Sequence, residues 1–188
     1  RHVVTELNAY DNIIWEICNE PGGGVGPADA PGPDEVNDWL AALNDAIRTT
    51  EADLPKQHII AGQEAFAYKL PQEEQNLLDV HQFADRSFAS AEYEVVNMHP
   101  LSNMKFRGKQ YNLGRFMQAQ LHLEAYRQYC LALYDQPKPL NLDEDNCASQ
   151  YKDLRGWIIH RKRAWTALLC GAHFDYIDFT INNYLETG

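Results

Sequence analysis

Short apolar runs rich in β-branched residues alternate along the chain with longer segments whose apolar residues recur at helical spacing. An apolar run that ends in polar or turn-forming residues is typical of a buried strand, and apolar positions every three or four residues indicate a helix. The predicted strands cover residues 12–20, 58–62, 93–100, 140–145 and 174–179. The predicted helices follow them at about 34–47, 72–88, 113–135 and 153–170, and residues 1–10 are read as the tail of an earlier helix. This alternation predicts an α/β fold with a parallel sheet of five β-α units and right-handed crossovers.

The helical segments also predict which side chains face the core. Asp34 is expected to cap the first long helix, and Arg161, Lys162 and Arg163 to form a solvated face of the last one. Apolar residues at helical spacing are expected to point inward: Val36, Trp39, Leu40, Leu43, Ile47, Phe116, Leu123, Tyr126, Cys130, Leu133, Ile158, Trp165, Leu168 and Leu169.

Polar residues gather where the predicted strands end. The first strand stops at Asn19 and Glu20 before a segment rich in glycine and proline, and later strands end at polar positions that include Gln63, Glu64, His99, Asp143, Glu144, Asp145 and Asn146. The carboxyl ends of parallel strands meet at one edge of a sheet, where α/β proteins build their active sites. Alternation also places Glu16 on the face that Glu20 would occupy, so an interior Glu16 is expected to be paired or protonated.

Two of these strand ends resemble a known family. The run Ile13-Ile14-Trp15-Glu16-Ile17-Cys18-Asn19-Glu20-Pro21 resembles the Asn-Glu-Pro signature that ends the fourth barrel strand of retaining glycoside hydrolases of clan A, most closely the cellulase-like family 5. The segment from Lys138-Pro139 to Glu144 resembles the seventh-strand motif of the same clan, although Asp143-Glu144-Asp145-Asn146 departs from the usual sequence around the nucleophile.

The resemblance implies a (β/α)8 TIM barrel. The five predicted units would correspond to strands four to eight, so that residues 1–188 would be the C-terminal portion of a single catalytic domain from which the first three units are absent. Such a fragment is expected to be inactive by itself. The activity implied is hydrolysis of O-glycosidic bonds of a β-linked glycan or glycoside by double displacement, which needs two carboxyl groups about 5 to 5.5 Å apart.

The same resemblance assigns roles to individual residues. Glu20 would be the general acid/base and Glu144 the nucleophile, while Asn19 would bind the sugar 2-hydroxyl and His99 would lie near the nucleophile. Further substrate contacts are expected from Glu64, Asn146 and Phe179. No metal and no cofactor are expected, and the partner would be a carbohydrate. A secreted or periplasmic location is favoured by the family.

Other interpretations of these residues stay open. Glu20 could be a loop carboxylate, and His99 could be a structural histidine that is satisfied in the core. The acidic triplet of residues 143–145 could hold a divalent cation in a metal-dependent hydrolase, since hard cations favour clustered carboxylates. The whole could also be a barrel that binds carbohydrate without turnover.

Composition narrows the classes of function. The 188 residues are 45% hydrophobic, which is enough apolar material for one domain with a sizeable core. The formal net charge of −11 disfavours nucleic acid and anionic membrane surfaces as partners, because both require clustered Lys and Arg. No apolar run approaches the roughly 18 to 20 residues that span a bilayer. The four cysteines, Cys18, Cys130, Cys147 and Cys170, lack the spacing of a zinc or redox site and are expected to be packing residues. The oligomeric state is not predicted.

Overall fold

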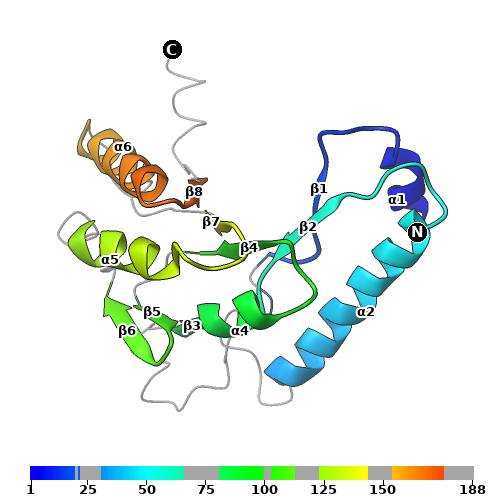
Figure 1. The fold of residues 1–188 in the computed structure, drawn as a ribbon, viewed down its shortest axis with the longest axis horizontal. Coiled ribbons are helices and arrows are strands. Elements are labelled where there is room, and N and C mark those ends of the chain that lie inside the picture. The colour runs from blue at the N-terminus through cyan, green and yellow to red at the C-terminus, as the bar shows by residue number, and fades with distance from the viewer. Residues whose placement is uncertain are drawn as a thin grey trace.

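The computed structural model describes residues 1–19, 21, 31–65, 81–99, 103–112, 123–143 and 154–175. Its centre is a five-stranded parallel sheet with the order β1-β2-β4-β7-β8 (Figure 1). The strands are β1 (Ile14–Glu16), β2 (Ile59–Gly62), β4 (Val95–Met98), β7 (Leu140–Leu142) and β8 (His173–Phe174). The five-stranded parallel sheet in chain order is therefore confirmed. Each strand overlaps its predicted range but is shorter than predicted within the described residues, and β8 overlaps its predicted range only at Phe174. The sheet does not close on itself within the described residues, so β1 and β8 are its outer strands.

Five helices are described: α1 (His2–Leu7), α2 (Pro33–Glu51), α4 (Ala84–Ala89), α5 (Leu123–Leu133) and α6 (Leu154–Leu169). In Figure 1, α1 and α2 lie beside β1 and β2, while α5 and α6 lie at the opposite end of the molecule. None of the described helices has the length and apolar character needed to cross a membrane.

The start of α2 differs from the prediction that Asp34 caps it. The cap residue is Gly32, whose backbone N–H donates a 2.8 Å hydrogen bond to the Glu35 carboxylate, and Asp34 lies inside the first turn. Pro33 decides this boundary, because proline suits the first helical position, where its missing N–H leaves no donor unpaired.

A second, smaller sheet was not predicted. It has the order β3-β5-β6 and consists of β3 (His81–Phe83), β5 (Asn103–Phe106) and β6 (Lys109–Asn112). β5 and β6 form an antiparallel hairpin around Arg107 and Gly108, which have φ angles of 48° and 76°. Two successive residues with positive φ match the twist that joins hairpin strands. The predicted loop after residue 100 therefore contains a hairpin. Of the predicted helix over 72–88, the structure describes only residues 81–88, which are strand at 81–83 and belong to α4 from residue 84.

The main core lies between the sheet, the hairpin and the helices α4, α5 and α6. Its members include Val96, Met98, Leu140 and Leu142 from the strands, with hairpin side chains Met104, Phe106 and Tyr111 and helical side chains Tyr126, Tyr129, Cys130 and Leu133. A smaller cluster of Val4, Ile47, Ile60 and Tyr93 fills the space between α2 and the strands β1 and β2.

The predicted inward residues Leu40, Ile47, Tyr126, Cys130 and Leu133 are confirmed as buried. Val36, Leu43 and Leu123 are partly buried, and Phe116 lies outside the described residues.

The prediction for α6 is wrong, because the helix presents the opposite face to the core. Its predicted inward residues, Ile158, Trp165, Leu168 and Leu169, are all exposed, the last of them by 78%. Among the side chains of α6 that the structure describes, the buried ones are Arg163 and Ala167, and the buried Cys170 follows directly after the helix. Ala167 is small enough for close packing on α5, and the Arg163 guanidinium carbon lies 4.0 Å from the centre of the Tyr126 ring.

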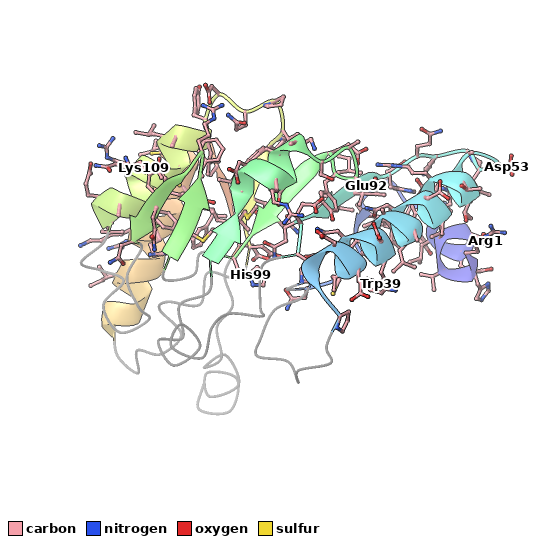
Figure 2. All side chains as sticks on the ribbon, turned by 90° about the horizontal axis from the view of Figure 1, so that it is seen from below. Arg1, Trp39, Asp53, Glu92, His99 and Lys109 are labelled. Atoms are coloured by element: carbon pink, nitrogen blue, oxygen red, sulfur yellow. The ribbon has the colours of Figure 1, made fainter. Side chains whose placement is uncertain are left out.

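Trp39 was also predicted to face the core and does not. It projects from α2 with 49% of its surface exposed (Figure 2). Leu40 and Ile47 occupy the face of α2 that packs on the sheet, and Trp39 lies about 100° away from Leu40 around the helix axis.

Candidate active site

One face of the five-stranded sheet lines a cavity of about 430 Å³, and we call this the cavity face. Its lining residues are Ile14, Glu16, Ala61, Val95, Asn97, Pro139, Asn141, Asp143, His173 and Asp175. These are alternate residues of each strand, as the pleat of a sheet requires. The residues between them point the other way, towards the helices, and include the buried Ile60, Val96, Met98, Leu140 and Leu142. The cavity face is therefore polar over β4, β7 and β8 although the strands themselves are apolar.

The first strand follows the predicted alternation. Ile14 and Glu16 line the cavity, whereas Trp15 faces α2 and donates a 2.9 Å hydrogen bond from Nε1 to Glu51 Oε1. Glu16 is nevertheless exposed. The expectation that Glu16 points into a buried interior is therefore wrong, because the side chain reaches solvent.

Four polar side chains form two rungs across β4 and β7 and their ends, and three of them, Asn97, Asn141 and Asp143, line the cavity. Asn97 pairs in register with Asn141, whose Nδ2 donates a 3.2 Å hydrogen bond to Asn97 Oδ1. Two residues further along, His99 Nε2 lies 3.8 Å from Asp143 Oδ2. His99 is only 2% exposed and Asp143 only 9%. Figure 2 shows His99 at the end of β4, which is the edge where the sequence predicted a site.

The end of β2 turns towards α4. The Glu64 backbone N–H donates a 2.9 Å hydrogen bond to Ser87 Oγ, and the Glu64 carboxylate lies 3.9 Å from Arg86 on the same helix. Glu64 is not among the residues that line the cavity. Next to it, the Tyr93 hydroxyl donates a 3.1 Å hydrogen bond to the Gln63 carbonyl oxygen. Burial, followed by the neighbouring carboxylate of Glu64, raises the pKa of Tyr93, which stays a neutral donor.

The segment after β1 is described as far as Asn19. Asn19 is exposed, and its carbonyl oxygen accepts a 3.2 Å hydrogen bond from Cys18 Sγ. Burial, and then the carboxylate of Glu16, raises the pKa of the Cys18 thiol. Cys18, Cys130 and Cys170 are all thiols, and the last two are buried, as packing residues should be. Cys147 lies outside the described residues.

The remaining predicted site residues lie outside the described part of the chain. They are Glu20, Glu144, Asn146 and Phe179. Their described neighbours are Asn19 and the buried Pro21 on either side of Glu20, and Asp143 directly before Glu144. Among the described residues, no group of three or more His, Cys, Asp or Glu is arranged to hold a metal ion.

Sequence reasoning missed four polar residues of the cavity face: Asn97, Asn141, His173 and Asp175. A signal for them was present. Each occupies an alternate position in or directly after an apolar strand, so the pleat points all of them away from the helix-covered core.

Comparison with known proteins agrees with this arrangement. The family model for cellulase (glycosyl hydrolase family 5) matches residues 1–128, which is 128 of the 188 residues. The matched range contains Asn19, Glu20, Glu64 and His99, and it ends before Glu144. Comparison with curated proteins and with solved structures gives no significant match. The parallel β-α units and the matched range together place the chain in glycosyl hydrolase family 5, whose members are (β/α)8 barrels that hydrolyse glycosidic bonds of carbohydrates.

Proposed function

We propose that this family 5 protein is a retaining glycoside hydrolase that acts on a β-linked glycan or glycoside, with Glu20 as the acid/base and Glu144 as the nucleophile. The observation that carries the proposal is the parallel sheet that contains both β1 and β7. Parallel strands end at one edge, and Glu20 and Glu144 each follow such an end in the sequence, after Asn19 and Asp143 respectively. The strands β1, β2, β4, β7 and β8 would then be barrel strands four to eight, and residues 1–188 the C-terminal part of one catalytic domain.

The two carboxyl groups would divide the reaction between them. Glu144 attacks the anomeric carbon while Glu20 protonates the departing glycosidic oxygen, which leaves a glycosyl ester on Glu144. Glu20 then removes a proton from water, and the water oxygen displaces Glu144 from the sugar. Asn19 would hold the 2-hydroxyl, and His99 would contact the nucleophile or the sugar beside it.

We assign further contacts with the carbohydrate substrate to Glu64, Asn146 and Phe179. An aromatic ring such as Phe179 can cover the apolar face of a sugar ring, and the amide of Asn146 can bond to two hydroxyls. Glu64 Oε2 lies 3.9 Å from Arg86 of α4, so a contact with substrate would come from the other carboxylate oxygen of Glu64.

Covalent trapping tests the proposal on the full gene product. A fluorinated aryl glycoside should label Glu144, and peptide mapping identifies the labelled residue. Glu144→Gln should abolish labelling. Glu20→Ala should still be labelled and should lose activity mainly on substrates with poor leaving groups. Glu124→Gln, on the exposed side of α5, is the matched control and should behave as the wild type.

Three other outcomes would contradict the proposal. A label on a different carboxylate would remove Glu144 from the nucleophile role. Loss of activity on chelation, with both glutamate variants still active, would favour the acidic triplet as a metal site. Glycan binding without turnover in the folded wild-type protein would favour a non-catalytic barrel.

A further inference from the structure

The pairing of β4 with β7 decides which residue of the acidic segment faces the cavity. The register pairs Val96 with Leu140, Asn97 with Asn141, and Met98 with Leu142. The ladder continues one step further, because the Asp143 backbone N–H donates a 3.0 Å hydrogen bond to the Met98 carbonyl oxygen. Continuing the same register sets His99 opposite Asp143.

Asp143 and His99 also meet through their side chains. Both are at least nine-tenths buried, and Oδ2 of Asp143 lies 3.8 Å from Nε2 of His99. The rung below them, Asn97 with Asn141, is neutral and hydrogen-bonded, so it fixes the spacing of the two strands at this level. At 3.8 Å the two atoms are at ion-pair distance rather than hydrogen-bond distance, and a carboxylate at this separation favours the protonated imidazole electrostatically.

Other ionisable groups of the cavity face lie on strands further from His99. His173 belongs to β8 and Asp175 directly follows that strand, which is separated from β4 by β7. Glu16 belongs to β1, on the far side of β2. Adjacent strands are about 4.8 Å apart, so a residue two strands away from His99 is at roughly twice that distance. Among the described residues of this face, Asp143 is therefore the carboxylate that dominates the surroundings of His99.

We propose that Asp143 is a positioning residue of the active site that acts through His99, by holding the imidazole protonated and turned so that it donates a hydrogen bond to an oxygen at the sugar-binding edge. This inference rests on the proposed function, in which His99 lies beside the nucleophile. It gives the residue before Glu144 a role of its own, separate from carrying the covalent intermediate. It also gives a function to the buried carboxylate of Asp143, which directly follows β7.

The first experiment measures the pKa of His99 directly and needs no activity. Imidazole resonances of the ¹⁵N-labelled protein are followed by NMR against pH, with His99→Gln used to assign the signal. The wild-type pKa of His99 should lie above the ordinary value of about 6.5. Asp143→Asn, which is nearly isosteric, should lower it by about one unit or more, a tenfold loss of proton affinity. The control Asp175→Asn, on the same face but one strand further away, should shift it by less than about a third of that amount.

Two results would overturn the inference. One is a wild-type His99 that titrates below about 6.5, which decides the matter even if Asp143→Asn does not fold. The other is a shift in Asp175→Asn that equals or exceeds the shift in Asp143→Asn.

The second experiment tests the consequence for catalysis. In the full gene product, the basic limb of kcat/KM against pH should move to lower pH in Asp143→Asn by the same amount as the pKa of His99. Asp143→Glu should restore most of the shift. A lower rate with an unmoved basic limb would show a merely structural role and would contradict the inference.

The fluoroglycoside label should remain on Glu144 in Asp143→Asn, and a label on Asp143 in the wild type would equally overturn the inference. Failure of labelling altogether would count against the proposed function, while the NMR titration still tests the pairing of Asp143 with His99.

Discussion

The carboxylate of Glu51 accepts two hydrogen bonds from His58, one of 2.9 Å from the backbone N–H and one of 2.6 Å from Nδ1. The other ring nitrogen of His58 lies 2.8 Å from the Tyr10 carbonyl oxygen. Both ring nitrogens therefore face acceptors, which is the bonding pattern of a protonated imidazole. Since Trp15 also donates to Glu51, this buried network joins the segment before β1, β1 itself, the end of α2 and the start of β2.

Removing one partner of this network should be costly. Glu51→Ala leaves the buried His58 and the indole N–H of Trp15 without their acceptor, and loss of a partner from a buried ion pair costs about 3 to 5 kcal/mol. The free energy of unfolding from urea titration measures this. Asp53→Ala, two residues later and exposed, is the matched control and should change it by less than about 0.5 kcal/mol. Equal effects of the two substitutions would contradict a structural role for the pair.

The same network predicts how stability depends on pH. Hydrogen bonds to Glu51, and then to the Tyr10 carbonyl, raise the pKa of His58 above its usual value. The contribution of His58 to the free energy of unfolding is therefore complete below about pH 6.5 and is lost as the pH rises through its raised pKa. Burial raises the pKa of Glu51, but the hydrogen bonds from His58 and Trp15 outweigh burial and lower it. The contribution of Glu51 to the free energy of unfolding is present above about pH 4.5 and is lost as the pH falls through its lowered pKa.

We therefore expect the free energy of unfolding to be highest between about pH 4.5 and 6.5 and to decline above that range. Urea titrations from pH 4 to 9 would show this profile. His58→Gln should flatten the decline on the alkaline side. A decline of unchanged steepness in that variant would assign it to other groups.

Arg163 should matter more than its neighbour Arg161. The two arginines lie on one helix, but Arg163 is fully buried over the Tyr126 ring and Arg161 is exposed. Arg163→Met should lower the free energy of unfolding by about 2 kcal/mol, because a desolvated cation above an aromatic ring is lost together with its other contacts. Arg161→Met should have an effect within about 0.5 kcal/mol. Thermal melts of both variants under one condition make the comparison, and a larger loss for Arg161 would show that α6 packs by another face.

Gly62 is required by the close approach of Tyr93. A Cβ added at Gly62 would lie 2.7 Å from a carbon atom of the Tyr93 ring. Gly62→Ala should therefore lower the free energy of unfolding by about 1 to 3 kcal/mol through overpacking. In a Tyr93→Ala background the same substitution should cost much less, and a double-mutant cycle measures that difference. Additive losses would mean that the strain arises elsewhere.

Residues 1–188 expressed alone should self-associate and show no glycosidase turnover. The sheet ends at β1 and β8 within the described residues, and Ile14 and Ile59 near one end of it are exposed. Strand edges that carry no lysines or prolines to protect them tend to pair with other chains. The apolar stripe of α6, with Trp165 and Leu169, adds an exposed surface. Light scattering coupled to size exclusion measures the mass, and a monomer that melts cooperatively and hydrolyses an aryl glycoside would contradict this expectation.

Local sequence determined the order and type of the central elements. The five parallel strands, and the helices α2, α5 and α6, were predicted because each carries its own apolar pattern and its own stop signals, such as Pro21 after the first strand and Pro137 after α5. Leu40, Ile47 and Tyr126 were predicted inward because their apolar stripe coincides with the buried face. The Asn-Glu-Pro segment likewise pointed to family 5 before any tertiary contact was known.

Tertiary structure decided what depends on partners distant in the chain. Ile158, Trp165 and Leu169 form a good apolar stripe, yet the described side chains of α6 that are buried are Arg163 and Ala167, because Arg163 packs over the Tyr126 ring of α5. The meeting of His99 with Asp143 depends on the register between two strands whose residues are 44 positions apart, and no local pattern encodes a register. Sequence could therefore name the polar strand ends, but only the folded sheet decides which of them face one cavity.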